Sequence, residues 1–293
     1  MRIIGSTAFL LVLVSHALGV SAFTTAPSAY VGKTTARSNQ HVLFMGWGPD
    51  PIWSSATVKA NENACASGKS VSLQVDVPPE TAAEFKVPGQ YVQVRLDEET
   101  KPLFLAIASA PSPENASFEF LIKQSDGNDW ITKIQPGTAV EMSQVLGNGY
   151  QMEENIEGFK FDFPTQNLLL FAAGSGLAPI KSVIESAQLN VQPVTGGRSC
   201  RVYYGERSQA DLCCVEKFAE WEAAGYQVVP VLSQPEDSWQ GRAGYIQNAL
   251  EEDGIAVPRN TGALMCGMKG MTESVKDLLT KAGVFDGRIL FNF

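Results

Sequence analysis

The segment from Leu168 to Glu185 constrains the fold of this chain more than any other segment. It begins with an apolar run that predicts a buried strand, and it continues through Gly-Ser-Gly into a stretch with helical periodicity. Pro179 falls in the first helical turn, where its missing N–H costs nothing. Gly174 and Gly176 allow a close backbone approach, and the helix N-terminus offers N–H groups to a pyrophosphate. The segment therefore predicts a dinucleotide site.

Four motifs in this half of the chain resemble the ferredoxin–NADP reductase superfamily. Gly174–Pro179 resembles its Gly-Thr/Ser-Gly-Ile/Leu-Ala-Pro motif, and Arg201–Arg207 resembles its second strand, which ends in Tyr-Gly-x-Arg. Met265–Met268 resembles its Cys-Gly motif, and the chain stops at Arg288–Phe293, like the aromatic final strand of many members. The resemblance implies a nicotinamide-nucleotide domain.

The rest of the chain predicts two domains of different class. Alternating runs at 71–77, 90–96, 118–122 and 138–142, divided by Pro and Gly, are typical of an antiparallel barrel or sandwich. Downstream, strands and helices alternate, which favours a parallel sheet with helices on both faces. The helices expected there are 211–224, 245–252 and 272–282, and the strands are 227–232 and 263–266. The fold class expected is therefore an N-terminal antiparallel β-barrel followed by an α/β parallel-sheet nucleotide-binding domain.

The barrel half also carries motifs that resemble the flavin domain of the same superfamily. Val87–Tyr91 resembles the Pro-Gly-Gln-Tyr/Phe segment, and Leu103–Pro111 resembles the flavin strand Arg-x-Tyr-Ser-Ile-Ala-Ser. Gln144–Gly149 resembles a Pro-Leu-Gly-Asn-Gly turn of the dihydroorotate dehydrogenase electron-transfer subunit, whose C-terminal cysteine cluster is missing here. The nearest resemblance is to plant plastid FAD/NAD(P)-binding oxidoreductases called fruit-protein-like, which share Phe-Leu-Ala-Ile-Ala-Ser. FAD and NAD(P)H are the implied cofactors.

The flavin strand departs from the family pattern. The family Arg, which pairs with the flavin pyrophosphate, falls on Leu103, the ring-covering Tyr on Leu105, and the Ser near N5 on Ala106. A lost charge-assisted hydrogen bond costs roughly 1.5–3 kcal/mol. Lys101 is expected to replace the charge in part. Backbone N–H groups around Ile107 and Ser109 remain, as do Asn148 and the glycines beside it. FAD stays the expected flavin, with FMN and no flavin as alternatives.

The resemblance implies a set of site residues. Cys266 is expected nearest the nicotinamide and Phe293 over the flavin, the alternatives being a buried strand cysteine and plain core packing. NADP-selective relatives carry Ser-Arg where this chain has Ser233-Gln234, so NADH and NADPH stay open, with Arg207 and Arg242 as candidate cations. The expected cofactor-binding residues are Leu105, Ala106, Ile107, Ala108, Ser109, Gly147, Asn148, Gly149, Gly174, Ser175, Gly176, Ala178, Pro179, Tyr204, Gly205, Arg207, Ser233, Gln234, Cys266, Gly267 and Met268.

The first 49 residues differ from the rest because they contain no acidic residue. A basic start, an apolar run and small residues before Phe23 predict a signal peptide at 1–22, and a Thr- and Ser-rich stretch predicts a transit peptide or disordered leader at 23–48. The FAD-binding barrel domain is then expected at 52–152 and the NAD(P)-binding domain at 165–293. The leader resembles the bipartite plastid presequence of algae with secondary plastids; a secreted protein is the alternative.

Composition excludes several function classes. The net charge of −9 argues against nucleic acid as a partner, and no 18-residue apolar run predicts a membrane span. The five cysteines form no C-x-x-C pair, so neither zinc nor an iron–sulfur cluster is indicated. Both histidines, His16 and His41, lie in the leader, which excludes a histidine-based triad. Cys213 and Cys214 are interpreted as small buried residues at a helix start.

The expected function is hydride transfer from NAD(P)H to FAD, followed by electron transfer to an unknown acceptor. A ferredoxin-type acceptor is disfavoured, because ferredoxins are acidic and the chain without its leader has 19 basic against 31 acidic residues. The alternative is a degenerate nucleotide-binding module of this fold that has a regulatory or complex-associated role and no turnover.

Overall fold

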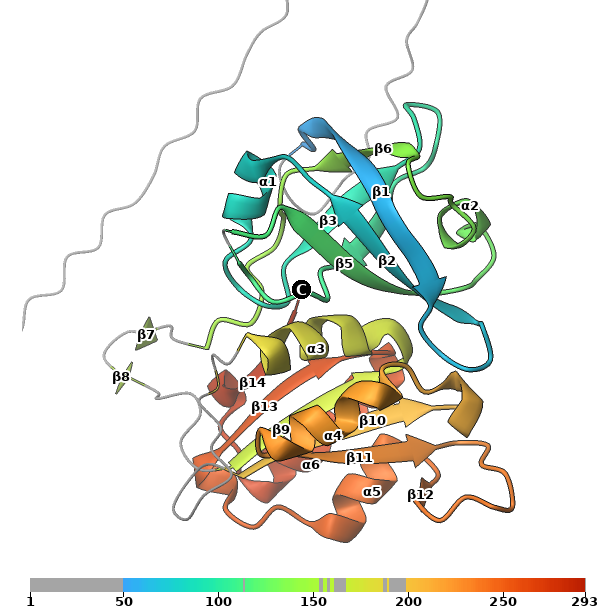
Figure 1. The fold of residues 1–293 in the computed structure, drawn as a ribbon. Helices are drawn as coiled ribbons and strands as arrows, with labels where there is room; N and C mark the ends of the chain where they lie inside the picture. Colours follow the sequence, from blue (N-terminus) through green and yellow to red (C-terminus); the bar gives the residue numbers. More distant parts are fainter. Residues whose placement is uncertain are drawn as a thin grey trace, which may run out of the picture. The chain divides into compact units, whose positions relative to one another are not determined.

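The computed structural model describes residues 50–112, 114–152, 155–156, 159–160, 167–186, 189 and 199–292 (Figure 1). All of these lie within one compact unit, residues 46–293. The expected leader segments 1–22 and 23–48 and the C-terminal Phe293 lie outside the described residues. The domain limits 52–152 and 165–293 therefore stay predictions.

The first half of the described chain is a nearly closed antiparallel barrel. Its elements are β1 (Trp53–Asn63), β2 (Ser70–Asp76), α1 (Pro79–Glu84), β3 (Tyr91–Arg95), β4 (Leu103–Ala106), β5 (Ser117–Lys123), α2 (Asp129–Thr132) and β6 (Ala139–Ser143). The strands pair in the order β4-β3-β6-β1-β2-β5. The two edge strands also approach each other, because Ala108 just after β4 donates its N–H to the Glu119 carbonyl of β5 at 2.7 Å. The predicted antiparallel barrel is confirmed.

The barrel follows from the alternation in its strands. In β2 the side chains of Val71, Leu73 and Val75 are buried. Val75 pairs with Val58 of β1 on one side and with Phe118 of β5 on the other. Because side chains directly opposite each other share a face of the sheet, these apolar residues fill one common core.

The second half is a parallel sheet. Its strands are β9 (Asn167–Ala173), β10 (Ser199–Glu206), β11 (Tyr226–Leu232), β12 (Arg242–Ala243), β13 (Thr261–Cys266) and β14 (Ile289–Phe291), in the order β12-β11-β10-β9-β13-β14. Its helices are α3 (Leu177–Glu185), α4 (Phe218–Ala223), α5 (Ile246–Asp253) and α6 (Lys269–Ala282), with short 3-10 turns η1 (Gly174–Gly176), η2 (Gln209–Asp211), η3 (Val215–Lys217), η4 (Pro258–Asn260) and η5 (Asp286–Arg288). A short antiparallel pair, β7 (Asn155–Ile156) and β8 (Phe159–Lys160), precedes the sheet along the chain.

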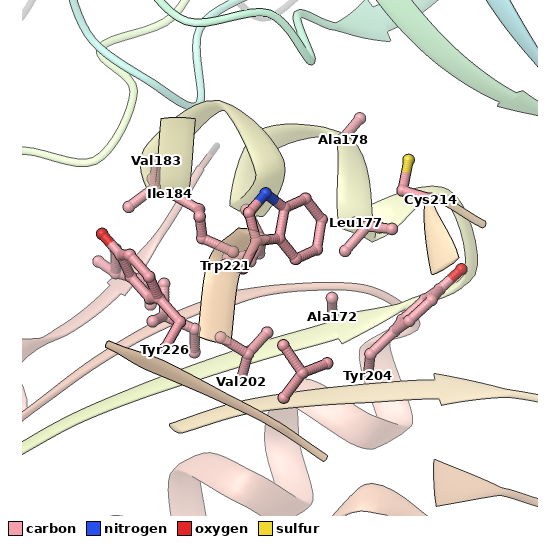
Figure 2. Close-up of a cluster of buried hydrophobic side chains, with 14 of the residues drawn as sticks. Ala172, Leu177, Ala178, Val183, Ile184, Val202, Tyr204, Cys214, Trp221 and Tyr226 are labelled. Atoms are coloured by element: carbon pink, nitrogen blue, oxygen red, sulfur yellow. The ribbon is translucent and has the colours of Figure 1, made fainter. Parts of the chain in front are cut away.

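Helices cover both faces of this sheet, as the alternation of apolar runs predicts. On one face, α3 and α4 pack against the strands through residues such as Ile184 and Trp221, which meet Val202 of β10 (Figure 2). On the other face, α5 and α6 supply Leu250 and Val275 to a separate cluster. The sheet is buried on both sides, which explains why β9 is a continuous apolar run rather than an alternating one.

One predicted element is wrong in its first half. The helix expected at 211–224 begins only at Phe218, as α4. Cys213 instead forms an antiparallel bridge with Cys65 of the β1–β2 turn, and Cys214 has φ of 57°, in the left-handed region that a right-handed helix excludes. Contacts to the barrel thus override local helical pattern. In the described part of the chain, no helix is long and apolar enough to cross a membrane.

Candidate functional site

The strand order places a ligand-binding edge beside β9. From β9 the chain continues to β10 on one side, whereas β13 pairs with β9 on the other side. In open α/β sheets, ligands bind outside the carboxyl ends of the strands at such a switch in direction. The two loops that leave these ends are the η1 turn after β9 and Cys266–Met268 after β13. Both were expected to bind cofactor.

The η1 turn is held against the end of β13. A Cβ atom on Gly176 would lie 2.3 Å from the carbonyl oxygen of Cys266, so only glycine fits between the two loops. Gly174 has φ of 59°, and its Cβ position is open apart from Glu206 and Lys123 side-chain atoms at 3.9 Å. From the sequence, both glycines were explained by the close approach of a ligand, whereas the structure shows that the packing of the two loops requires glycine at position 176.

The η1 turn and the first residues of α3 include one exposed residue and two buried ones. Ser175 is exposed in η1, just before α3, and the backbone N–H groups and the helix dipole at a helix start favour an anion. Ala178 and Pro179 are buried, like the other α3 residues up to Ile184, so they hold α3 in place rather than line a surface.

The β13 loop presents a thiol and an exposed side chain. Cys266 is partly buried, and burial raises the pKa of its thiol to about 12, so it stays protonated at neutral pH. Gly267 lies against β9, because a Cβ there would be 2.9 Å from the Cβ of Ala173. Met268 is 70% exposed and is the residue of this loop that faces solvent.

A buried tyrosine from the barrel side stands near this loop. Tyr150 is fully buried, its hydroxyl has no hydrogen-bond partner among the described residues, and burial together with the nearby Cys266 thiol raises its pKa. The Oδ1 atom of Asn292, after β14, is likewise buried without a described partner. A Cβ on Gly89 would lie 3.0 Å from the Tyr150 ring and 3.2 Å from the Asn292 Cβ, so these residues are neighbours.

The sequence interpretation missed Tyr150 and Asn292. The available signal was position, because Tyr150 directly follows the Gly147-Asn148-Gly149 motif and Asn292 falls within the aromatic C-terminal strand. Phe293, expected over the flavin, lies outside the described residues.

The carboxyl ends of β10 and β11 lie side by side. Gln234 donates its backbone N–H to the Arg207 carbonyl at 2.8 Å, and Ser233 donates to the Glu206 carbonyl at 3.0 Å. The side chains of Arg207 and Gln234 are exposed. Arg242 instead bonds the carboxylates of Glu252 and Asp253, so its charge is already compensated and the expectation that it assists a phosphate loses support.

Tyr204 and Gly205 serve the packing of β10. Tyr204 is fully buried, and its hydroxyl accepts a hydrogen bond from the Cys213 N–H at 3.1 Å. A Cβ on Gly205 would lie 2.9 Å from the Ile246 side chain of α5. Glu206, next along the strand, accepts a 2.6 Å hydrogen bond from Lys123 of the barrel strand β5. This ion pair is the contact that brings Lys123 beside Gly174.

On the barrel, the two flavin-type motifs fold against each other. Gln90 donates its side-chain N–H to the Gly147 carbonyl at 3.0 Å, and Tyr91 and Leu146 exchange two backbone hydrogen bonds. A Cβ on Gly149 would lie 2.6 Å from the Pro88 carbonyl, which makes glycine necessary there. The loop leaves Asn148 exposed at its tip.

The register of β4 assigns its side chains to faces. Leu103 and Leu105 lie opposite Val94 and Val92 of β3 and pack against the barrel core. Phe104 is on the outer face, 64% exposed, with its ring centroid 5.9 Å from that of Tyr91.

The residues on the outer face of β4 therefore differ from those that the family alignment predicts. Phe104 and Tyr91 form an aromatic surface there that the family alignment does not predict, although the alternation of apolar residues contains the signal. Ala106 lies on the same face as these rings, because it pairs with Tyr91. Leu105 was expected to contact flavin, and its place on the core face gives that prediction no support.

The segment after β4 lies between the barrel and α3. Ile107 and Ala108 are fully buried, and their N–H groups donate to the carbonyls of Gln90 and Glu119. Those N–H groups are therefore not free for a pyrophosphate, contrary to expectation. The Ser109 carbonyl accepts a 2.7 Å hydrogen bond from Ser182 of α3.

Comparison with known proteins agrees with this arrangement. Residues 170–277 match the family described as oxidoreductase NAD-binding domain. The fruit protein pKIWI502 of Actinidia deliciosa is 32% identical over 273 residues, which covers 90% of this chain and 81% of that protein. The chain belongs to the ferredoxin–NADP reductase-like family of FAD- and NAD(P)-binding oxidoreductases.

Two further similar proteins have lower sequence identity to this chain. The anthranilate 1,2-dioxygenase electron transfer component of Acinetobacter baylyi is 23% identical, over 69% of this chain and only 56% of its own length. The structure of a ferredoxin NADP+ reductase from Neisseria gonorrhoeae with bound FAD and NADP superposes with a TM-score of 0.63 at 16% identity, covering 82% of this chain and 97% of that one. The latter comparison establishes the two-domain fold.

Proposed function

We propose that the protein is an NAD(P)H-dependent flavoprotein oxidoreductase that binds FAD and passes electrons to a separate acceptor. The carrying observation is a pair of buried polar atoms that have no hydrogen-bond partner among the described residues: the Tyr150 hydroxyl, near Cys266, and the Oδ1 atom of the neighbouring Asn292. Burying a hydroxyl or an amide oxygen without a hydrogen bond costs roughly 1–3 kcal/mol each. The Tyr150 hydroxyl and the side-chain Oδ1 of Asn292 are both buried without a hydrogen-bond partner in the part of the chain that the structure describes, which supports a polar ligand as their partner.

The residues present fit both cofactors in kind. The exposed ring of Phe104 and the half-buried ring of Tyr91 offer a stacking surface on the barrel, and the 144–149 loop adds the exposed amide of Asn148. The η1 turn with Ser175 offers the start of α3 to a pyrophosphate. We assign the flavin to the barrel side and the nucleotide to the turn.

With both cofactors bound, the chemistry is hydride transfer from the nicotinamide to the flavin and onward electron transfer. In this proposal, the chain's own residues orient the two cofactors and exclude water from between them. Cys266 remains a neutral thiol because its pKa is about 12, so it contributes small, polarisable packing and no proton. Tyr150 remains a neutral phenol and can donate one hydrogen bond to a bound ligand.

The test is the colour and cofactor content of the purified protein. We expect a yellow protein that releases FAD on denaturation and loses its flavin absorbance when NADH or NADPH is added without oxygen. A colourless protein that takes up neither FAD nor FMN would overturn the proposal and favour the alternative, a nucleotide-binding module without turnover. Comparing the two nucleotides in the same assay decides between NADH and NADPH. Of the two candidate cations for the 2′-phosphate of NADPH, the exposed Arg207 is the one that remains.

We also propose that the acid-free first 49 residues direct the protein to a plastid. The kiwifruit relative is consistent with a plant-type origin. Residues 1–48 fused to a fluorescent protein should label plastids in an algal cell with secondary plastids. Secretion of that fusion into the medium would support the alternative.

A further inference from the structure

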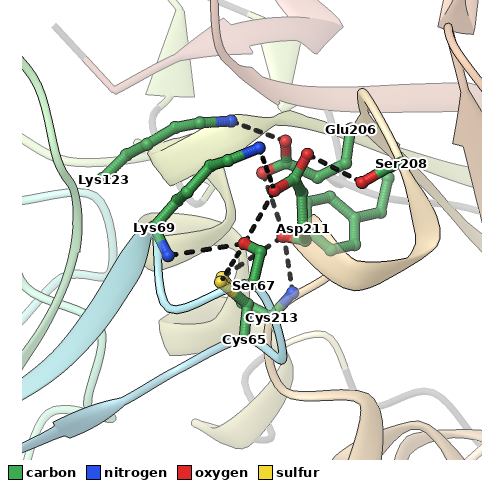
Figure 3. A network of polar contacts seen from close by, with 9 residues as sticks. Cys65, Ser67, Lys69, Lys123, Glu206, Ser208, Asp211 and Cys213 are labelled. Atoms are coloured by element: carbon green, nitrogen blue, oxygen red, sulfur yellow. Dashed lines mark hydrogen bonds and ion pairs between the residues drawn. The ribbon is translucent and has the colours of Figure 1, made fainter.

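Two cysteines from distant parts of the chain meet where the barrel contacts the parallel-sheet half. Cys65 lies in the turn between β1 and β2, and Cys213 lies in the segment between η2 and η3. The two form an isolated antiparallel bridge, and both are buried in one cluster (Figure 3). Neither belongs to the candidate cofactor site.

The backbone hydrogen bonds identify the type of this pair. Cys214 donates its N–H to the Ala64 carbonyl at 3.4 Å, which flanks the bridge, whereas the Cys213 N–H donates to the Tyr204 hydroxyl. Cys65 and Cys213 are therefore a non-hydrogen-bonded antiparallel pair. In such pairs the Cα atoms lie about 4.5 Å apart and the side chains are close. A disulfide spans Cα distances of roughly 4.4–6.8 Å.

The two thiols differ in acidity. Burial disfavours the Cys65 thiolate, but hydrogen bonds from Ser67, whose Oγ lies 3.3 Å from the sulfur, and from the backbone at Ser70 and Lys69 outweigh it and lower its pKa. Burial raises the pKa of Cys213 to about 11. Since the thiolate is the reactive form, Cys65 is the attacking thiol and Cys213 the resolving one.

Of the three other described cysteines, Cys266 belongs to the candidate cofactor site, and the remaining two are placed differently from Cys65 and Cys213. Cys214 follows Cys213 but lies in the surroundings of Lys181 and Glu119, and burial raises its pKa to about 12. Cys200 is buried within β10, with a pKa well above the usual value. Neither stands in a bridge with Cys65.

We propose that Cys65 and Cys213 form a reversible disulfide that links the barrel covalently to the parallel-sheet half. The oxidant is a low-molecular-weight disulfide such as oxidised glutathione. The Cys65 thiolate attacks one of its sulfurs, and the first glutathione leaves with the proton lost from Cys65. Cys213 then loses its proton and attacks the Cys65 sulfur of the mixed disulfide, and the second glutathione leaves with that proton. Two protein thiols are oxidised by two electrons, and one disulfide is reduced to two thiols.

The disulfide would add a covalent bond to a contact between the β1–β2 turn and the segment around Asp211 that polar side chains already form. Around the cysteines, Ser67 donates to the Asp211 carboxylate at 2.7 Å and Lys69 pairs with the same carboxylate at 3.1 Å (Figure 3). The disulfide closes a loop that contains about half of the chain, from residue 65 to residue 213, so its formation restricts the unfolded state strongly. We therefore expect oxidation to raise the melting temperature.

Peptide mapping of the full-length protein tests the proposal. The purified chain is equilibrated with excess oxidised glutathione, free thiols are alkylated, and the digest is analysed by mass spectrometry. We expect a linked peptide pair containing Cys65 and Cys213, 2 Da lighter than the two separate peptides, which dithiothreitol releases. Cys214→Ser serves as the matched control, because it changes the adjacent cysteine and should keep the link.

Melting of the oxidised and reduced forms gives a second measurement. We expect the oxidised wild type to melt about 4 °C or more above the reduced form, with no difference in Cys213→Ser. The proposal is overturned if the wild type yields only glutathione adducts, if Cys65 links to Cys214 instead, or if Cys65 stays reduced. Because the peptide map of the wild type alone distinguishes these outcomes, a poorly folding variant does not weaken the test.

Discussion

At the scale of single residues, the start of α3 makes a direct prediction about nucleotide binding. Ser175 is exposed in a turn where the neighbouring backbone is packed against β13. A negative charge there repels a pyrophosphate, and two charges about 4 Å apart interact by roughly 1–4 kcal/mol at the dielectric of a protein surface. We expect Ser175→Asp to raise the Kd for NAD(P)H about tenfold or more.

Ser175→Asn is the matched control for that substitution, because the asparagine side chain has the shape of aspartate but carries no charge. Its Kd should stay within about threefold of the wild-type value, since the two variants differ only in electrostatics. Both can be measured by fluorescence titration of the same preparation. Equal affinities for the two variants would remove the η1 turn from the nucleotide site.

Tyr150 allows a second test at this scale, because its hydroxyl is buried without a described partner. Tyr150→Phe removes an unpaired polar group, so the cofactor-free protein should lose no stability and can gain up to about 1 kcal/mol. The Kd for FAD should rise about five- to tenfold if the hydroxyl bonds a bound ligand. Urea unfolding without cofactor and FAD titration measure the two effects. A loss of more than about 2 kcal/mol with unchanged FAD affinity would show that the hydroxyl serves the protein core instead.

At the scale of elements, the turn between β1 and β2 depends on a buried carboxylate. Burial disfavours ionised Asp211, but hydrogen bonds from Ser67 and Ser208 and the charge of Lys69 lower its pKa to about 2. A depressed folded-state pKa stabilises the protein above the unfolded value near 3.8, and this contribution disappears as pH falls toward about 2. Asp211→Asn should therefore cost about 2 kcal/mol at pH 7 and progressively less between about pH 4 and pH 2.

Urea unfolding at several pH values measures this difference. Asp237→Asn is a suitable control, because Asp237 is exposed and the substitution removes the same charge from the surface. It should change the free energy of unfolding by less than about 0.5 kcal/mol at each pH. A constant deficit for Asp211→Asn down to pH 2 would contradict the electrostatic explanation.

Elements also show how far the sequence could predict this molecule. The barrel and the sheet follow from local alternation and buried runs. The observed β11 begins one residue before the expected range 227–232, and α5 is shifted by one residue at both ends from the expected range 245–252. The helix expected from residue 211 fails because Cys213 pairs with Cys65, a contact across almost 150 residues that no local pattern contains. From the sequence, Gly176 was explained by ligand binding, although its close contact with the end of β13 already requires glycine there.

The candidate site was predicted less completely than the fold, for a related reason. Motif alignment assigned Leu105 to the flavin, whereas pairing with β3 puts Phe104 on the outer face. Tyr150 acquires its significance only when the barrel loop meets the end of β13, which depends on the packing of both halves. Motifs locate the loops of a site, and the register decides which side chains reach it.

At the scale of the whole molecule, a buried lysine joins the two halves. Lys181 of α3 is 4% exposed and contacts the carboxylates of Glu119 on β5 and Glu185, both at 2.7 Å. Lys181→Met keeps the apolar stem but leaves two carboxylates without their cation. Removing one partner of a buried ion pair typically costs 3–5 kcal/mol; because both glutamates are about one-fifth exposed, we expect a loss of about 2–3 kcal/mol.

A compensated variant separates this charge effect from a packing effect. Lys181→Met combined with Glu119→Gln and Glu185→Gln removes the uncompensated charges and should recover at least half of the lost stability. Urea unfolding followed by both tryptophan fluorescence and circular dichroism measures stability and cooperativity together. We expect coincident transitions in the wild type and separated ones in Lys181→Met, because this contact couples the barrel to the sheet. If the triple variant is as unstable as the single one, the lysine acts through its packed stem, and the ion pair is not what holds the halves together.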